Sequence, residues 1–521
     1  MRVPLGGYNE PWRVLTARSG FGVRTDANEV LSDEELVESL RAGEVWNRSR
    51  ELRDIAGWVD FRYSSGEAIN VLRARAAIFP SHANTYPFPL PKESGGRRTL
   101  LYCDPYDEAV YRAVVGRVAG RIDFGLSDGV ESYRVRSLHP TWRLRNFRYG
   151  DSACRKRAHA FAGSDLFGAL VKFDVKEYYP SIDVDHLAVT LVSEFGCPDG
   201  SVRRIVDLLG DWQVNWGVRG VPVGPEASGL LGNAMLAPLD RALKEEGIGF
   251  SRFTDDVTLY LSPNQKWEAV RDMVVDVLGS MGLELNDKKT VHVTDPLEAR
   301  LHAGDDAILD RLASLLKEDP RAGSDRVRWL FDIEVERPRP SWRRIRFALR
   351  TFTNRADPHG LDAIYNDGRL WSVAPGHCGD YLTRMIERGH CDVEWLIEQA
   401  TTKPTSGTAA TRYHQLLALR SEGRLPASLG DHLREVALST LGMWLPIRVA
   451  AADLLAKTQK WTPGEALAAA REVGSVHLQR AFVLSLRHGR TPKAKELAKM
   501  RTYEACLPAL KYLQNQRAYS N

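Results

Sequence analysis

The sequence predicts an α+β domain followed by an all-α domain built from repeated helices. Strand-like and helix-like segments alternate between residues 166 and 295, as in a sheet that carries helices on one face. Beyond about residue 300, amphipathic helices follow one another with short polar or Gly/Pro breaks, and strand patterns almost vanish. Helices stacked in this way are typical of HEAT-like repeats, and an irregular helical bundle is the alternative.

The composition is that of a folded protein with several domains. The chain has 521 residues, of which 43% are hydrophobic and 26% are charged, enough for a hydrophobic core of normal size. The net charge of +4 is compatible with a nucleic-acid partner without requiring one. The six cysteines form no CxxC pair, and neither an apolar leader nor a long apolar run occurs. We therefore expect a cytoplasmic protein that does not bind membranes.

Breaks in the pattern divide the chain into three segments. Residues 33–46 have a helical pattern behind Ser32, a suitable N-cap. The stretch 79–96 is rich in proline and glycine, so we expect a loop or linker there, followed directly by a strand. We predict an N-terminal extension, an α+β domain and a helical domain over residues 1–90, 91–298 and 299–521.

Apolar spacing predicts the elements of the α+β segment in order. Period-two or continuous apolar runs indicate strands, and apolar residues three or four apart indicate helices. The expected strands cover residues 97–105, 166–175, 250–261 (two strands around a tight turn) and 283–293 (a hairpin or a strand). The expected helices cover residues 107–122, 184–196, 201–212, 229–247 and 267–282.

Carboxylates stand at the ends of two of these apolar strands. Asp174 closes the run LVKFD, where a buried aspartate costs free energy unless a counter-charge accompanies it. Asp255 and Asp256 occupy the expected turn in FTDDVTLYL. A turn or capping aspartate is the simpler explanation for either place alone. If the strands are neighbours, however, the carboxylates meet at one edge of the sheet and can hold divalent cations.

Four motifs occur in the order found in reverse transcriptases. They are FDVKEYY, RGVPVGPEASGLLGNAMLAPLD, FTDD and GLELNDKKT. FTDD is similar to the family's Tyr-x-Asp-Asp box with Phe253 in place of the tyrosine, and Arg219 stands where the second motif usually has glutamine. The resemblance covers roughly residues 90–295 and implies the fingers and palm of a right-hand polymerase, which acts as an RNA-directed DNA polymerase.

The resemblance implies a catalytic role for each residue that matches a motif. Asp174, Asp255 and Asp256 correspond to the ligands of two Mg²⁺ ions, which Mn²⁺ can replace, in a two-metal phosphoryl transfer. Lys289 matches a lysine near the triphosphate that protonates pyrophosphate, and Lys288 is the alternative.

Other matching residues are expected to bind the incoming dNTP. Tyr179 matches the steric gate, whose ring presses on a 2′-hydroxyl, and Tyr178 is the alternative if the register shifts by one. Two arginines that open a strand suit the triphosphate, because a guanidinium pairs bidentately with phosphate oxygens. The expected nucleotide-binding residues are Arg97, Arg98, Tyr179, Gly224, Pro225, Ser228 and Asn233.

A basic segment between residues 134 and 157 predicts contact with nucleic acid. Aromatic residues interleave with its arginines, and positive charge follows a phosphate backbone while aromatic faces stack on bases. A solvated basic surface is the alternative. The arginines expected to bind nucleic acid are Arg134, Arg136, Arg143, Arg145 and Arg148.

The helical C-terminal half indicates which kind of reverse transcriptase the chain resembles. It contains neither the acidic tetrad of a ribonuclease H domain nor a His/Cys-rich nuclease, and a polymerase followed by helical repeats resembles bacterial abortive-infection reverse transcriptases of the AbiK type. This resemblance implies a homo-oligomer in the bacterial cytoplasm that acts in antiphage defence. It also implies DNA synthesis primed from a protein tyrosine, sometimes without a template. The expected partners are dNTPs, the DNA product and RNA.

Two other functions stay open. One is an RNA-templated reverse transcriptase of the retron or intron type, which works with a noncoding RNA. The other is an inactive RNA-binding scaffold, against which the retention of three costly carboxylates argues. The sequence alone does not select a priming tyrosine among those near the chain ends, which are Tyr8, Tyr503, Tyr512 and Tyr519.

Overall fold

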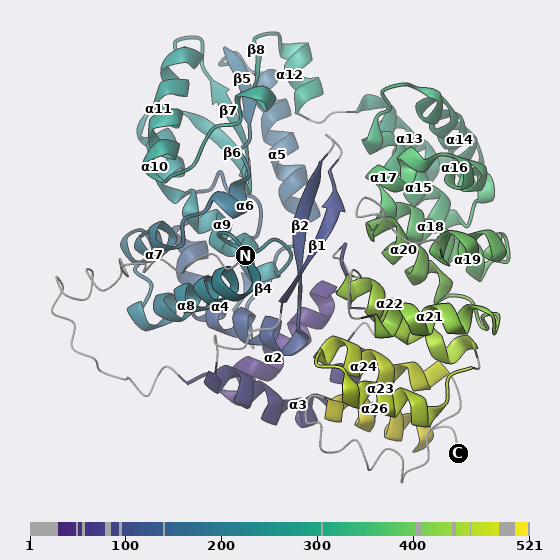
Figure 1. Ribbon diagram of the computed structural model, residues 1–521. Coiled ribbons are helices and arrows are strands. Elements are labelled where there is room, and N and C mark those ends of the chain that lie inside the picture. Colours follow the sequence, from purple (N-terminus) through teal and green to yellow (C-terminus); the bar gives the residue numbers. More distant parts are fainter. Residues whose placement is uncertain are drawn as a thin grey trace, which may run out of the picture.

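The computed structural model confirms the predicted α+β fold class with an all-helical C-terminal region (Figure 1). The α+β region and the helical region lie on opposite sides of a two-stranded hairpin. The repeat character of the helices and the domain boundaries stay predictions. The described residues are 30–47, 51–54, 58–78, 85–92, 96–138, 141–303, 306–401, 409–439, 444–458, 460–488 and 506–518.

The palm is a four-stranded antiparallel sheet in the order β6-β7-β5-β8. Its strands are β5 (Ala169–Phe173), β6 (Gly249–Phe253), β7 (Asp256–Leu261) and β8 (Val291–Val293). Successive side chains of a strand point to opposite faces, yet Leu170 and Val171 are both fully buried. The expectation of helices on one face was therefore wrong, because both faces carry apolar side chains that need cover.

Helices cover the two faces of this sheet. α5 (Phe147–Ala162) and α12 (Pro296–His302) cover the face of Leu170, and α10 (Ala237–Glu245) and α11 (Trp267–Ser280) lie on the opposite side (Figure 1). The remaining helices of the region are α4 (Pro105–Gly125), α6 (Tyr178–Ser181), α7 (Val184–Ser193), α8 (Asp199–Trp216) and α9 (Glu226–Met235), beside the short hairpin of β3 (Val135–Ser137) and β4 (Arg143–Leu144).

A hairpin of β1 (Thr85–Pro91) and β2 (Arg97–Cys103) separates the two hydrophobic cores. Leu100 and Tyr102 belong to the core of the helical region, whereas Leu101 and Cys103 belong to the core of the α+β region. The two-residue period of a strand produces this division.

The linker expected over residues 79–96 was wrong in part, because β1 occupies residues 85–91. Three prolines suggested a loop, but Pro87, Pro89 and Pro91 alternate with the buried residues Phe88 and Leu90. β1 pairs with β2 alone, so it is an edge strand, where a residue without an N–H is tolerated.

The N-terminal helices close against the C-terminal end of the chain. The helix expected over residues 33–46 is confirmed as α2 (Asp33–Asn47), and α3 (Val59–Ile78) packs on α26 (Leu507–Ala518). Arg480 of α24 (Val476–Ser485) is buried and pairs with Asp54 at 3.2 Å and with Asp60 at 2.8 Å. Buried ion pairs therefore join segments from the two ends of the chain.

The helical region consists of short helices packed on their neighbours, such as α18 (Pro375–Glu387) beside α20 (Ala409–Leu419) and α21 (Leu429–Leu438) beside α22 (Leu445–Leu455). Within the described residues, no helix has the length and apolar content needed to cross a bilayer. The helices of this region are α13 (Ala307–Glu318), α14 (Pro320–Glu336), α15 (Trp342–Arg355), α16 (Leu361–Asn366), α17 (Gly368–Val373), α18 (Pro375–Glu387), α19 (Val393–Thr401), α20 (Ala409–Leu419), α21 (Leu429–Leu438), α22 (Leu445–Leu455), α23 (Pro463–Glu472), α24 (Val476–Ser485) and α26.

Candidate active site

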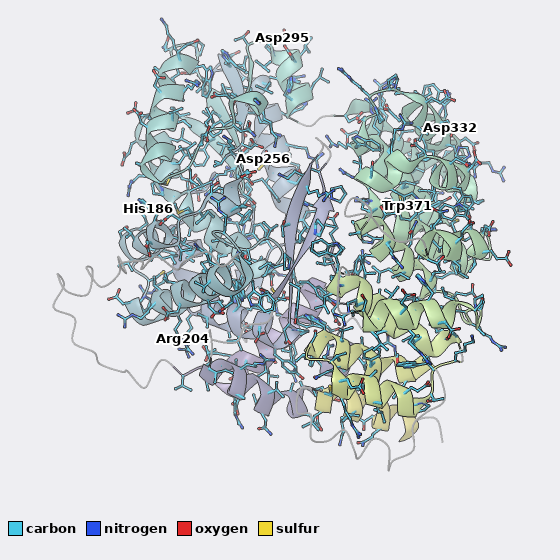
Figure 2. All side chains as sticks on the ribbon, viewed as in Figure 1. His186, Arg204, Asp256, Asp295, Asp332 and Trp371 are labelled. Carbon is cyan, nitrogen blue, oxygen red and sulfur yellow. The ribbon has the colours of Figure 1, made fainter. Side chains whose placement is uncertain are left out.

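Asp174 stands one residue beyond the end of β5. The last residue pair between β5 and β7 is Phe173 with Val257, so Asp174 and Asp256 are the next positions of the same ladder. On the other side of β5, the Asn286 N–H donates to the Asp174 carbonyl oxygen at 3.0 Å. Asp174 and Asp256 therefore lie at one edge of the palm sheet, and Figure 2 labels Asp256 between the sheet and the β1–β2 hairpin.

Lys289 lies at this edge because the chain before β8 contains three more residues than the part of β5 beside it, and these extra residues form a bulge. β8 pairs with Leu170–Lys172, and residue 285 bridges residue 175. Between these pairings, the single 3-10 turn Asp287–Lys289 stands away from the sheet. The Lys289 ammonium lies 2.5 Å from Asp174 Oδ2. The structure thus favours Lys289 over its neighbour Lys288 for the predicted lysine, whose role stays a prediction.

The turn Thr254–Asp255 connects β6 to β7. Phe253 pairs with Asp256 across it, which confirms the strand, tight turn and strand expected over residues 250–261. Thr254 has a φ of +59°, in the left-handed region that β-branched residues rarely adopt. Such strain persists only where the surrounding structure fixes the chain.

A buried network beneath the turn fixes it. Arg252 is fully buried, pairs with Asp240 of α10 at 2.6 Å and donates to the Thr254 carbonyl at 2.9 Å. It also donates to Asn233 Oδ1 at 3.1 Å, and the Thr254 N–H donates to Ser132 Oγ at 2.7 Å. Sequence reasoning missed these supports. The available sign was an arginine inside the apolar strand FSRF, since a buried charge needs a counter-charge.

The aspartates at this edge are close enough to influence one another's ionisation. Burial raises the pKa of Asp255 to about 6, and the charges of Asp256 and Asp174 add to the shift. Burial also raises the pKa of Asp256, again with a contribution from Asp174. The hydrogen bond with Asp174 raises the pKa of Lys289. Negative charge is therefore costly at this edge unless a cation accompanies it.

The donor set fits a magnesium ion that is completed by substrate. Asp174 Oδ1 is buried and accepts no hydrogen bond, which is the state of a ligand oxygen awaiting a cation. Across the described part of the chain, no three His, Cys, Asp or Glu side chains are grouped closely enough to enclose a metal by themselves. Mg²⁺ is commonly held by one or two carboxylates together with substrate phosphates. Asp174 and Asp255, with Asp256 beside them, are the residues that would hold it.

The two candidate gate tyrosines differ in their surroundings. Tyr178 is buried, and its hydroxyl donates to the Gly232 carbonyl, so it is part of the core. Tyr179 is half-buried, and burial raises its pKa with further contributions from the neighbouring Tyr133 and Asp255. Because Tyr178 is committed to the core and Tyr179 is partly exposed, the structure favours Tyr179 for the predicted gate, a role that stays a prediction.

Two residues expected to line the nucleotide pocket face the interior instead. Asn233 is 0% exposed and bonds Ser132 and Arg252, and Ser228 is 1% exposed with its hydroxyl 3.4 Å from that of Tyr111. The motif that contains them builds α9, whose ten residues are all buried. The predicted place of the two side chains beneath a nucleotide stays a prediction.

The chain that leads to Gly224 and Pro225 contacts the β1–β2 hairpin at Val223 and Gly224. The Leu101 N–H donates to the Val223 carbonyl at 2.8 Å, and a Cβ on Gly224 would lie 3.0 Å from the Leu101 carbonyl oxygen. Gly224 also has a φ of +132°, which an L side chain rarely adopts. Their predicted place beneath a nucleotide stays a prediction, but the structure shows this contact with β2.

The hairpin arginines are exposed near its tip. Arg97 and Arg98 open β2, and Arg98 forms an ion pair with Glu51. Their predicted contact with a triphosphate stays a prediction.

The basic segment divides into internal and exposed arginines. Arg134 pairs with Asp123 at 2.8 Å and donates to three backbone carbonyls, so its guanidinium is engaged within the protein, and its predicted contact with nucleic acid stays a prediction. Its acid partner, eleven residues earlier in another element, could not be assigned from the sequence. Arg136, Arg143 and Arg145 are exposed and form no ion pair with a described residue. The Arg148 side chain lies outside the described residues.

Exposed rings accompany these arginines. Phe147 is 60% exposed and Tyr149 is 74% exposed, both in the first turn of α5. Large rings in water beside positive charge are unusual on a surface that binds nothing. The combination agrees with the predicted contact with nucleic acid, which stays a prediction.

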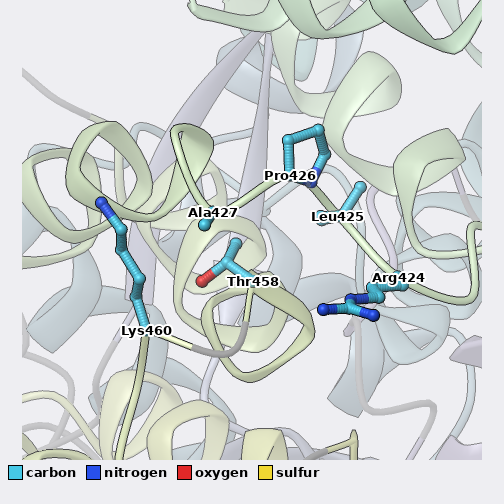
Figure 3. A pocket seen from close by; sticks show the side chains of 6 residues that line it. All are labelled: Arg424, Leu425, Pro426, Ala427, Thr458 and Lys460. Carbon is cyan, nitrogen blue, oxygen red and sulfur yellow. The ribbon is translucent and has the colours of Figure 1, made fainter.

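A cavity of about 550 Å³ in the helical region lies away from this edge (Figure 3). Its lining includes Lys460, which pairs with Asp431 at 2.9 Å, and Thr458, which donates to the Leu455 carbonyl at 2.7 Å. No carboxylate lines it. The cavity therefore has no part in the chemistry of the aspartates.

The antiparallel palm and the carboxylates at its edge define the class of a nucleotidyltransferase of the polymerase type. Residues 106–330 match the family model described as reverse transcriptase (RNA-dependent DNA polymerase). The chain therefore contains a reverse transcriptase domain and is an RNA-directed DNA polymerase. The match includes Asp174, Tyr179, Asp255, Asp256 and Lys289, and it ends within α14.

Distant likenesses to solved structures were also found. Apo telomerase from Candida tropicalis is similar over 89% of this chain and 76% of its own, with 12% identity and a TM-score of 0.33. Telomerase from Candida albicans, in complex with the TWJ fragment of telomeric RNA, is similar over 66% of this chain and 70% of its own, with 13% identity and a TM-score of 0.28. Likenesses at these scores carry no conclusion about this chain. No curated protein matches the sequence.

Proposed function

We propose that the chain synthesises DNA by transferring nucleotides from dNTPs at the palm edge formed by Asp174, Asp255 and Asp256. The observation that carries this proposal is the incompletely compensated negative charge there. Asp174 Oδ1 is buried without a partner, and the pKa of Asp255 is raised to about 6. Charge kept at a cost in stability is typical of a site that a cation and substrate complete.

Each residue at the edge has a role that follows from its position. Bound Mg²⁺ supplies the positive charge that activates the attacking hydroxyl and stabilises the leaving pyrophosphate. Lys289 is ion-paired with Asp174 and 58% exposed, so its side chain is free to turn to the pyrophosphate and donate a proton. Tyr179 would exclude a ribose 2′-hydroxyl.

Primer extension tests the proposal. The purified chain is incubated with Mg²⁺, labelled dNTPs and a DNA primer annealed to an RNA template. We expect extension by the native chain and a loss of at least about 10³-fold for Asp255→Asn, because the metal contributes several kcal/mol to the transition state. Asp272→Asn is the matched control, since the Asp272 side chain is 80% exposed on α11. Native-like extension by folded Asp255→Asn would refute the proposal.

We also propose that this polymerase acts in bacterial antiphage defence, as a cytoplasmic homo-oligomer that can prime on its own tyrosine. The support is the joining of a reverse transcriptase domain to an all-helical region, the arrangement of the AbiK type. Tyr512 is buried in α26, which argues against it as the primer. The other candidates, Tyr8, Tyr503 and Tyr519, lie outside the described residues.

RNA-templated synthesis with a noncoding RNA is the second candidate, and the RNA-dependent description of the matched family favours it. Incubation of the chain with each dNTP and Mg²⁺, without template, separates the two. Protein-primed synthesis should leave labelled DNA on the denatured protein after phenol extraction. Synthesis that requires added or co-purified RNA and leaves the protein unlabelled would instead select the templated enzyme.

A further inference from the structure

Two tyrosine rings lie against the same face of α9. Gly229 and Gly232 are three residues apart, and residues at this spacing share a face of a helix. A Cβ on Gly229 would lie 2.2 Å from Cε1 of Tyr133, and a Cβ on Gly232 would lie 3.1 Å from Cε1 of Tyr179. Both rings therefore pack against glycines of the helix. At position 229 any side chain would collide with the Tyr133 ring, so only glycine fits there.

The backbone around Tyr133 is held in place by the catalytic turn. Tyr133 has a φ of +46°, which is rare for an aromatic residue. Its neighbour Ser132 accepts from the Asn233 side-chain amide at 2.6 Å and from the Thr254 N–H at 2.7 Å. The Glu131 N–H donates to the Arg252 carbonyl at 2.9 Å. The strained segment is thus fixed to the residues that carry Asp255.

Both rings lie near the carboxylates. Burial, followed by the charge of Asp255, raises the pKa of Tyr133, and Tyr133 and Asp255 both contribute to the raised pKa of Tyr179. The Tyr133 hydroxyl has no hydrogen-bond partner among the residues described, so packing alone holds its ring. The pair of rings therefore forms an aromatic wall that ends at the metal-binding edge.

We propose that Tyr133 is a second specificity-determining residue of the nucleotide pocket, where it forms with Tyr179 a two-ring wall for the base and sugar of the incoming dNTP. A dNTP has a flat, largely apolar nucleoside at one end and a metal-bound triphosphate at the other. Aromatic faces beside carboxylates match both ends, because a base stacks on a ring while the carboxylates hold the metal that binds the triphosphate. The inference rests on the proposed function and adds a residue that none of the four motifs contains.

Steady-state kinetics of three variants tests this role. Tyr133→Phe keeps the ring, and we expect a KM for dNTP within about twofold of the native value, because packing rather than the hydroxyl holds the ring. Tyr133→Leu removes the ring and should raise KM at least about tenfold, with a smaller change in kcat. Gly229→Ala should reproduce the effect of Tyr133→Leu, because the new Cβ displaces the ring.

Gly210→Ala is the matched control for the glycine variant. Gly210 lies within α8, and a Cβ there would meet no atom within 4 Å. It should therefore leave KM unchanged, and its melting temperature should not fall, because alanine suits a helix better than glycine. A purely structural role of Tyr133 would lower the melting temperature and kcat without the selective rise in KM. That result would overturn the inference.

Calorimetric titration of dATP with Mg²⁺ separates failure of the inference from failure of the proposed function. If the native chain extends primers while folded Tyr133→Leu and Gly229→Ala keep the native KM and Kd, the inference is wrong and the proposed function stands. If the native chain binds dATP without incorporating it and both variants bind at least about tenfold more weakly, the inference stands and the proposed function fails. Absence of dATP binding by the native chain overturns the inference.

Discussion

Buried carboxylates are fully paired with arginines in the helical region, whereas those at the edge of the palm sheet are only partly compensated. Asp453 of α22 is 1% exposed and lies between Arg420 at 2.8 Å and Arg487 at 3.0 Å. Burial opposes its ionisation, yet the two arginines hold the pKa of Asp453 well below its usual range. At the palm edge, by contrast, burial raises the pKa of Asp255, and Asp174 Oδ1 has no hydrogen-bond partner.

The difference separates residues that hold the fold from residues that await a ligand. A buried carboxylate with well-placed arginines is a finished contact, and removing one partner leaves an uncompensated charge. A buried carboxylate without a full set of partners keeps a ligand position open at a cost in stability. By this criterion the palm edge is the reactive site, and the ion pairs of the helical region are structural.

The largest effect on the free energy of unfolding is expected where a buried carboxylate is fully paired with arginine. Arg480→Leu leaves Asp54 and Asp60 buried without their counter-charge, which should lower the free energy of unfolding by about 3–5 kcal/mol. Urea titration followed by circular dichroism measures the loss. Arg384→Leu is the control, because Arg384 pairs with Glu387 on the exposed surface of α18, where such pairs contribute less than about 1 kcal/mol. Equal losses in the two variants would contradict the comparison.

A smaller effect of opposite sign is expected at the palm edge. Because the pKa of Asp255 in the folded chain lies above its ordinary value, ionising it destabilises the metal-free fold. The penalty is absent near about pH 4, grows as the pH rises to about 6 and stays constant above that. In the presence of chelator, Asp255→Asn should therefore be more stable than the native chain by about 3 kcal/mol at neutral pH and close to it near about pH 4.

Denaturant titrations across this pH range measure the gap between the two chains. Mg²⁺ with dNTP should raise the melting temperature of the native chain, with a larger increase above the pKa of about 6 than below it, and should not raise that of the variant. A stability gap that does not change with pH would contradict the raised pKa of Asp255.

The smallest effects are expected from the exposed charges. Arg136→Ala and Arg145→Ala should each weaken nucleic-acid binding only severalfold and reduce the slope of log Kd against log salt by about one. Fluorescence anisotropy with labelled RNA at several salt concentrations measures both quantities. Arg241→Ala on α10 is the control, because Arg241 is 54% exposed but pairs with Glu194 at 2.6 Å. Unchanged salt slopes for both arginine variants would show that the basic segment is a solvated surface.

Features encoded by neighbouring residues were predictable from the sequence, whereas features that depend on contacts between distant residues were not. The turn that carries Asp255 and Asp256 was predictable, because two apolar strands and a polar turn are encoded within a dozen neighbouring residues. The strand β1 was not, because its three prolines are tolerated only at the edge of a sheet, which is a tertiary property. The burial of Ser228 and Asn233 was not predictable for a related reason, since it depends on everything packed around α9.

The sequence by itself determined most of the helices and strands and the polymerase class of this protein, because helical period, strand ends and the order of the acidic motifs are local properties of the chain. Only the tertiary structure decided which charges are compensated. Thr254 meets Ser132 across 122 positions, and Arg480 meets Asp60 across 420. Contacts over such separations leave no trace in spacing or composition, and they set the burial and dielectric environment on which every pKa at the site depends.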